Sequence, residues 1–227
     1  NMNLKQPENA EKFHLNLYLN QAGRTEYNAF FTQQVGQKWS TTLSAHFEDQ
    51  SKKNDRNEDG FLDTPLHNDY IVFNQWNYRS KKIHMELGIN GVIGNMQSGA
   101  IGQPSSYPVT IETQQANAFA KIGYLFPNED FNSLALQLSS TYNNQSTTIG
   151  PTNYTGSQYS AYANLIYQHE LGEKEENFFK IGASCQLDSV NENVQSLKVN
   201  PAINQFLEIV PGVYGEFTHN TEKWGVI

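Results

Sequence analysis

The sequence predicts an all-β fold, a transmembrane antiparallel β-barrel with about eleven strands. Three observations support this prediction. Apolar and polar residues alternate along most of the 227 residues, short and long connections alternate between these segments, and every tryptophan lies near a short connection. Alternation gives each strand one apolar and one polar side, whereas a helix needs apolar residues at three- and four-residue spacing. Short turns at one end, longer loops at the other and interfacial aromatic residues are together typical of membrane barrels.

Each predicted strand rests on its own alternation. The first places Phe13 and Leu17 on one side and His14 and Asn16 on the other. Later segments repeat this period-two pattern around 39–47, 83–89, 134–138 and 179–187. The predicted strands cover 13–20, 25–35, 39–50, 68–78, 83–95, 111–125, 131–145, 157–170, 178–190 and 204–218, and an eleventh begins at 224. Several exceed the ~9–11 residues of a tilted membrane strand, so we expect them to project beyond the membrane.

The alternation also assigns a side to each residue. We expect lipid to contact Leu43, Leu87, Leu136 and Ile181, and the barrel lumen to contact Thr42, Glu86, Gln137 and Lys180. Two strands depart from the pattern. Ile71 and Phe73 break the alternation of 68–78. Pro211 has no N–H to give to a ladder, so we expect a β-bulge in 204–218.

The connections predict which ends of the strands lie together. Short ones fall at 36–38, 79–82, 126–130, 171–177 and 219–223, and long ones at 51–67, 96–110, 146–156 and 191–203. The short connection at 21–24 is an exception, because the alternation expects a long one there. If the short turns are periplasmic, Trp39, Trp76 and Trp224 all lie at the periplasmic interface. They would share it with Tyr124, Phe126, Phe131 and Phe179.

Composition narrows the classes of protein. A formal net charge of −8 and a pI near 5.2 argue against a nucleic-acid partner. A mean hydropathy of −0.62 argues against helical membrane spans but permits a barrel, whose strands are half polar. Composition alone also fits a soluble β-domain. Cys185 is the single cysteine, and its alternation places it on the apolar side. The absence of a secretory signal and the new strand at the end lead us to expect an interior fragment.

The chemistry-bearing residues predict no enzyme. The six histidines show no metal-ligand spacing in the sequence, and His14, His46 and His84 fall on the polar side, where we interpret them as luminal filler. No nucleophile elbow and no glycine-rich phosphate loop is present. We therefore expect no catalytic and no cofactor-binding residues.

One loop matches a metal-binding pattern. Asp55, Asn57, Asp59, Phe61 (through its carbonyl) and Asp63 stand at positions one, three, five, seven and nine of an EF-hand calcium loop, with Gly60 at six. Position twelve is Leu66 rather than the bidentate glutamate. The sequence thus predicts a Ca²⁺ site here, and the alternative is a turn held by Asp and Asn side chains that bind backbone amides.

Several stretches carry a resemblance to a known family. They are 15–27 (LNLYLNQAGRTEY), 57–65 (NEDGFLDTP) followed by 73–78 (FNQWNY), 160–171 (SAYANLIYQHEL) and 208–217 (EIVPGVYGEF). In this order they span most of the chain, and 179–187 looks like the family's strand between the last two. The chain resembles the barrel of TonB-dependent outer-membrane receptors, particularly the cobalamin- and siderophore-receptor-like members of Bacteroidetes-type bacteria.

The resemblance implies the rest of the expectation. Residues 1–227 would form part of a 22-stranded barrel in a Gram-negative outer membrane, closed by a plug domain that is outside this chain. The implied function is ligand-gated import of a scarce nutrient, such as a metal chelate or cobalamin. The implied partners are membrane lipid, TonB through the plug, a small-molecule or metal-chelate ligand and a surface lipoprotein. The alternatives are a passive porin-like or structural barrel, and a soluble β-sandwich binding domain or surface enzyme.

Overall fold

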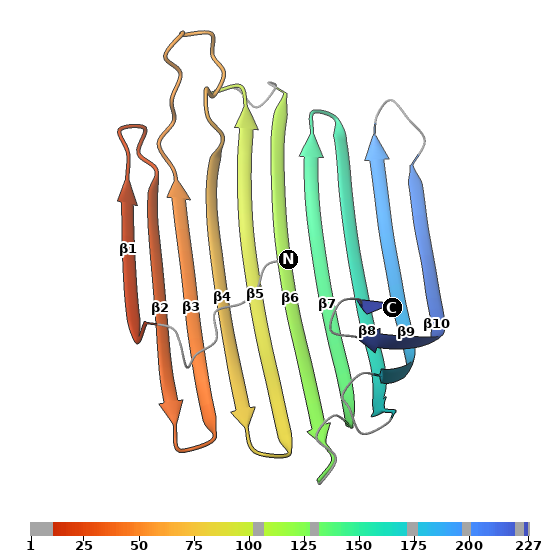
Figure 1. The fold of residues 1–227 in the computed structure, drawn as a ribbon. Coiled ribbons are helices and arrows are strands. Elements are labelled where there is room, and N and C mark those ends of the chain that lie inside the picture. The colour runs from red at the N-terminus through yellow and green to blue at the C-terminus, as the bar shows by residue number, and fades with distance from the viewer. Residues whose placement is uncertain are drawn as a thin grey trace.

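The computed structural model describes residues 11–101, 107–127, 132–171, 177–196, 201–220 and 225–226. They form one antiparallel sheet of eleven strands, in which neighbours in the sequence are neighbours in the sheet (Figure 1). The strands are β1 (Phe13–Leu19), β2 (Thr25–Val35), β3 (Trp39–Gln50), β4 (Leu66–Arg79), β5 (Ile83–Gly99), β6 (Pro108–Leu125), β7 (Ser133–Ile149), β8 (Thr152–Glu170), β9 (Asn177–Ser196), β10 (Ala202–Asn220) and β11 (Gly225–Val226). The prediction of an all-β meander is confirmed, and no helix capable of crossing a membrane occurs in the described part.

The predicted strand ends are accurate at one end of the sheet, and at the other end the predicted strands are too short from β4 to β10. At the end with the short turns, each described strand ends within two residues of its predicted limit. At the opposite end, β9 continues to Ser196 and β7 to Ile149. The long loop predicted at 146–156 is therefore wrong, because Gly150 and Pro151 alone connect β7 to β8. Strands that project into water are wetted on both sides, so the alternation that marks a strand disappears there.

The register places most apolar positions on one side of the sheet. Leu43 pairs with Phe31 of β2, and the same side carries Ile89 on β5 and Leu138 on β7. We name this side the apolar face; it also carries Leu87, Leu136, Leu165, Ile181, Cys185 and Ile209. The other side, the polar face, carries Thr42, Gln75, Glu86, Asn117, Gln137, Asn164 and Lys180. Every residue assigned to a side from the sequence lies on the predicted one.

Burial in this sheet is the reverse of burial in a soluble domain. Among the described residues, no hydrophobic side chain is buried, and the buried ones are polar, such as Gln75 at 1% exposure. Large apolar side chains are exposed, including Ile89 at 62% and Leu165 at 46%. Soluble monomers rarely expose a continuous apolar surface of this kind. A sheet that is apolar outward and polar inward is the arrangement of a barrel wall in lipid.

Two belts of aromatic rings border the apolar face. At the short-turn end, the ring of Trp39 lies 4.9 Å from that of Tyr78 and 6.3 Å from that of Trp76. At the other end, the rings of Phe47 and Tyr70 are 4.9 Å apart. Each belt residue of β3 and β4 lies eight positions from its counterpart (Trp39 and Phe47, Tyr78 and Tyr70). Eight residues at ~3.3 Å and a tilt of ~40° give a height of ~20 Å, close to the ~25 Å apolar band of membrane barrels.

The belt at the short-turn end continues along the sheet. The ring of Phe126 lies 5.3 Å from that of Tyr124 and 6.2 Å from that of Tyr167. Phe179 lies on the same face and is 39% exposed. Trp224 and Phe131, which the sequence also assigned to this belt, lie outside the described residues.

The two irregular strands have different explanations. Ile71 and Phe73 do lie on the polar face, where the ring of Phe73 stacks at 6.5 Å on that of Phe119. The Phe119 ring lies over Gly88, since a Cβ there would come within 2.2 Å of Phe119 Cε1. The bulge predicted at Pro211 is wrong, because the β9–β10 register continues unbroken through its pairing with Cys185. A strand accepts proline where its nitrogen faces an unpaired edge, and β10 has such an edge over this part of the described sheet.

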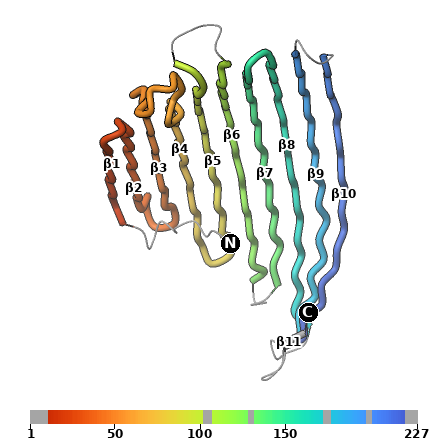
Figure 2. Tube along the Cα trace, turned by 90° about the horizontal axis from the view of Figure 1, so that it is seen from above, coloured from red at the N-terminus to blue at the C-terminus, as the bar shows by residue number. Residues whose placement is uncertain are grey.

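The sheet is open. In both views β1 and β10 lie at opposite sides, with the remaining long strands in order between them (Figures 1 and 2). The apolar residues of β1 are exposed, with Phe13 at 63% and Leu19 at 72% exposure. Long edge strands template association with other strands, and a closed barrel removes them.

Candidate functional site

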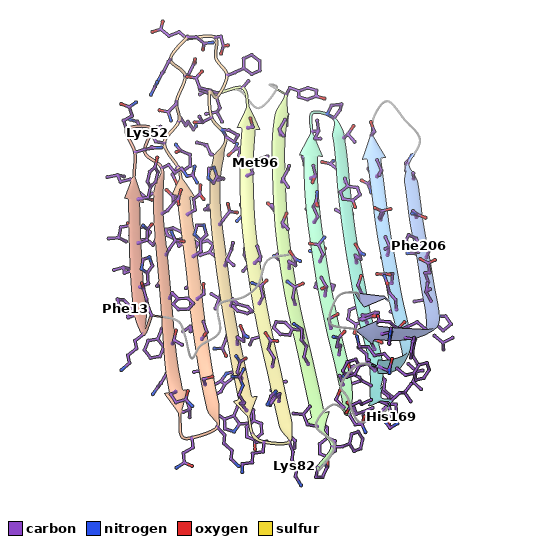
Figure 3. The ribbon with its side chains drawn as sticks, viewed as in Figure 1. Phe13, Lys52, Lys82, Met96, His169 and Phe206 are labelled. Atoms are coloured by element: carbon purple, nitrogen blue, oxygen red, sulfur yellow. The ribbon has the colours of Figure 1, made fainter. Side chains whose placement is uncertain are left out.

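The Asp-rich loop (residues 54–65) belongs to the connection between β3 and β4 and lies at the end of the sheet opposite the short turns. Figure 3 shows Lys52 and Met96 at this end and Lys82 and His169 at the other. Backbone hydrogen bonds attach the loop to the end of β5, from Leu62 N to Gly99 O (3.0 Å) and from Ile101 N to Gly60 O (2.7 Å). On the opposite side, Asn54 Nδ2 donates to Ala22 O of the β1–β2 turn at 3.0 Å. The loop is therefore held between two neighbouring connections.

The carboxylates of this loop bind its own backbone. Asp55 accepts hydrogen bonds from the amides of Asp59 (3.2 Å) and Gly60 (3.1 Å), and Asp63 accepts one from Arg56 N at 2.8 Å. Asp59 accepts from Phe61 N (2.8 Å) and from Asn57 Nδ2 (2.9 Å). Gly60 has a φ of +80°, a conformation that favours glycine. This is the hydrogen-bonded turn that stood as the alternative to calcium, and binding an ion would require the carboxylates to exchange amides for it.

Calcium remains a prediction for this loop, with a direct test. Calcium at ten times its dissociation constant should slow proteolytic cleavage within 54–65 by about tenfold, because only the closed loop binds the ion. Asp59→Ala should abolish this protection by removing position five of the pattern. Glu58→Gln is the matched control, since Glu58 stands at position four and supplies no ligand. Equal cleavage rates in calcium and in chelator would leave only the hydrogen-bonded turn.

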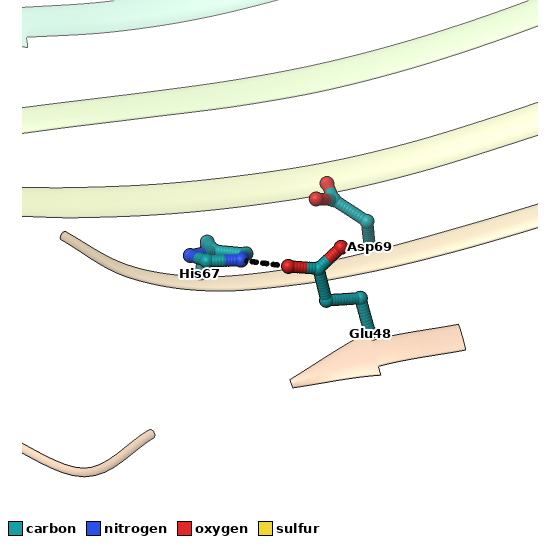
Figure 4. A group of neighbouring side chains, drawn as sticks. All are labelled: Glu48, His67 and Asp69. Atoms are coloured by element: carbon teal, nitrogen blue, oxygen red, sulfur yellow. Dashed lines mark hydrogen bonds and ion pairs between the residues drawn. The ribbon is translucent and has the colours of Figure 1, made fainter. Parts of the chain in front are cut away.

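A second cluster lies on the polar face below this loop. It consists of Glu48 on β3 and His67 and Asp69 on β4, three residues that point into the same space (Figure 4). Glu48 pairs with Asp69 across the strands, and His67 follows two positions away on the same face. His67 Nε2 lies 2.5 Å from Glu48 Oε1. Within the described ranges, this is the one group of three His, Cys, Asp or Glu residues whose ligand atoms all lie within 4.8 Å of one another.

Two further residues complete this group, which we name the luminal-end cluster (Arg24, His46, Glu48, His67 and Asp69). His46 Nε2 lies 3.7 Å from Glu48 Oε2. Arg24 Nε lies 2.6 Å from Glu48 Oε1, but its N–H has no hydrogen-bond acceptor in line, so the contact is an ion pair only. The Glu48 side chain is 12% exposed. A carboxylate shielded to this degree keeps its charge because cations and donors surround it.

Sequence reasoning missed this cluster. It considered the spacing of histidines along the chain, and residues 46–48 and 67–69 are separated by the whole β3–β4 connection. The interpretation of His46 as luminal filler is incomplete, because the side chain contacts Glu48. The sequence did contain a signal for this cluster. His46 and Glu48 lie on one face of β3, and His67 and Asp69 lie on the same face of β4. Antiparallel pairing of β3 with β4 brings the two pairs together.

A second polar network lies at the short-turn end of the same face. Gln75 Nε2 donates to Glu86 Oε1 at 2.7 Å and to Asn77 Oδ1 at 3.0 Å, and Lys121 Nζ lies 3.3 Å from Glu86 Oε2. Each side chain of this network therefore has a hydrogen-bond or ion-pair partner within it. A large apolar hollow on the apolar face, lined by Leu87, Leu138 and Leu187, follows the sheet surface and contains almost no polar group, so it offers a ligand no directional contact.

Comparisons with known proteins bear on the fold. No protein-family model matches the chain, and no curated protein sequence matches it either. Among solved structures, the chain is similar to the crystal structure of the ferric yersiniabactin uptake receptor FyuA from Yersinia pestis, with a TM-score of 0.51 and 14% sequence identity. The match covers 91% of this chain, which spans 38% of the length of that receptor. A likeness at this identity shows the fold, and it confirms the predicted class, the wall of a β-barrel.

Proposed function

We propose that this chain is part of a TonB-dependent outer-membrane receptor that imports a scarce nutrient. The observation that carries the proposal is the sheet itself, polar on one face and apolar between two aromatic belts on the other. Its likeness to an uptake receptor favours import over the other uses of a barrel. The unpaired edges of β1 and β10 would continue into the remaining strands of a 22-stranded barrel.

The mechanism in this proposal is binding followed by gating, without covalent chemistry. A barrel of that size has a lumen wide enough to need a plug. A small molecule, such as a metal chelate or cobalamin, would bind between the outer loops and the polar face. TonB would then pull on the plug from the periplasm and open a path. The plug, TonB, membrane lipid and a surface lipoprotein are the partners that this proposal includes.

The alternatives make different predictions. A β-sandwich needs two packed sheets, and the described strands form a single sheet, which disfavours a soluble binding domain or surface enzyme. A passive porin-like or structural barrel has the same wall. A passive barrel differs from the proposed importer because transport through it needs no energy from the inner membrane.

The test uses the full-length gene in its host. Uptake of radiolabelled ferric siderophores and of cobalamin should fall to background when the gene is deleted, and equally when TonB is removed. Restoring the gene is the control for secondary effects. Uptake that needs the gene but continues without TonB would establish the passive channel instead. Release of the protein from membranes without detergent would contradict every barrel function.

A further inference from the structure

We propose that the luminal-end cluster holds a binding site for a single divalent transition-metal ion, with His67, Glu48 and Asp69 as ligands. This site is separate from the Asp-rich loop, whose oxygen atoms suit calcium. The inference goes beyond the import function and does not depend on it, because it starts from the register of β3 and β4.

The distances fit one ion after a small adjustment. Zinc-like ions hold nitrogen and oxygen at ~2.0–2.2 Å, which places two ligand atoms of a tetrahedron ~3.4 Å apart. The ligand atoms of Glu48, His67 and Asp69 all lie within 4.8 Å of one another, so modest side-chain movement brings them to that spacing. His67 Nε2 and Glu48 Oε1 are closer, at 2.5 Å, which is the spacing of a hydrogen bond. Replacing this hydrogen bond by an ion requires the two atoms to separate by ~1 Å, which rotation of the Glu48 carboxylate would supply.

The Nδ1 atoms of His46 and His67 have hydrogen-bond partners that fix the orientation of each ring. His46 Nδ1 lies 2.6 Å from Asn28 Oδ1, and His67 Nδ1 lies 3.3 Å from Pro65 O. Both oxygens are acceptors, so each Nδ1 carries the hydrogen and each Nε2 is the nitrogen left for the cluster. Metal-binding histidines in proteins are held in this way, by a carbonyl or carboxylate on the nitrogen away from the ion.

A glycine makes room for the third ligand. Asp69 pairs with Gly94 on β5, and a Cβ at Gly94 would come within 2.5 Å of Asp69 Oδ1. The carboxylate can therefore lie against the backbone of β5 on the polar face. A larger residue at position 94 would displace this carboxylate from its place against β5.

The charge of the cluster matches a divalent cation. Arg24 contacts Glu26 at 2.5 Å as well as Glu48, so it keeps a partner if Glu48 turns to an ion. Glu26 and Glu48 contact this guanidinium, and Asp69 lies beside Glu48, so three carboxylates and one guanidinium leave two negative charges when the histidines are neutral. An imidazole with two carboxylates suits Zn²⁺, Co²⁺ or Fe²⁺, whereas Ca²⁺ and Mg²⁺ prefer oxygen ligands alone.

The experiment uses the full-length protein, purified in detergent without a histidine tag and titrated with Co²⁺. We expect a visible Co²⁺ absorption band that Zn²⁺ displaces and Ca²⁺ does not. His67→Ala and Glu48→Gln should each weaken the binding at least about tenfold. His84→Ala and Glu86→Gln are matched controls on the same face at the other end of the sheet, and Asp59→Ala controls for the loop. All three should bind Co²⁺ like the wild type.

Two results would overturn the proposal. One is equal Co²⁺ affinity in the wild type, His67→Ala and Glu48→Gln. The other is an equal loss in the control variants. Circular dichroism verifies the fold of each variant, and His67→Gln replaces His67→Ala if the latter misfolds. The titration needs neither TonB nor uptake, so the failure of the import function and the failure of this site are distinguishable.

Discussion

Leu138→Arg should destabilise the protein in lipid by about 2–4 kcal/mol, whereas Gln137→Arg should have a small effect. The two residues are adjacent on β7 but lie on opposite faces. Leu138 is 41% exposed on the apolar face, and it lies midway between Leu134 and Tyr142, which are level with the two aromatic belts. An arginine there would place its guanidinium near the middle of the hydrocarbon, where nothing hydrates it. At position 137 the same group would reach the polar face, beside Asn164.

Denaturant unfolding of the full-length protein, reconstituted in lipid vesicles, measures both variants. The pair is matched because the substituted residue, the strand and the depth are the same, and only the face differs. Equal destabilisation would mean that the apolar face does not contact lipid. The exposed apolar side chains would then have to pack against protein.

Cysteines at Lys53 and Lys81 should show opposite labelling in intact cells. Lys53 lies in the connection that carries the Asp-rich loop, and Lys81 lies in the turn between β4 and β5; both side chains are exposed. If the short turns are periplasmic, Lys53→Cys should react nearly completely with a membrane-impermeant maleimide and Lys81→Cys should react only after lysis. Lys81 is preferable to Ser80, whose hydroxyl is bonded to both the N–H and the carbonyl of Ile83.

The labelling is done with Cys185 replaced by alanine, because that thiol is exposed on the apolar face. Lysed cells give the control for total reactivity. Reaction of Lys81→Cys but not Lys53→Cys in intact cells would invert the orientation. The luminal-end cluster would then lie at the periplasmic end of the lumen.

The sequence determined most of the sheet. Period-two alternation depends only on neighbouring residues, so it identified every strand and placed Leu43, Leu87, Gln137 and Lys180 on the correct faces. The alternation failed to identify strand residues where both faces of the strand are in the same environment. The ends of β7 and β8 lie beyond the aromatic belt, and their Asn, Ser and Thr residues carry no pattern that distinguishes a wet strand from a loop.

What only the tertiary structure decided is which distant side chains meet. The sequence displays Asp55, Asp59 and Asp63 as a local motif, because their spacing is itself the signal. Glu48, His67 and Asp69 have no such spacing, and they meet because the β3–β4 register pairs Glu48 with Asp69. The connection between β3 and β4 is long, and its Phe61 pairs with Ala100 just after β5. The distance along the sequence between Glu48 and Asp69 therefore says nothing about their pairing. A local pattern therefore determines the face of a residue, and the closing of the chain determines its neighbours.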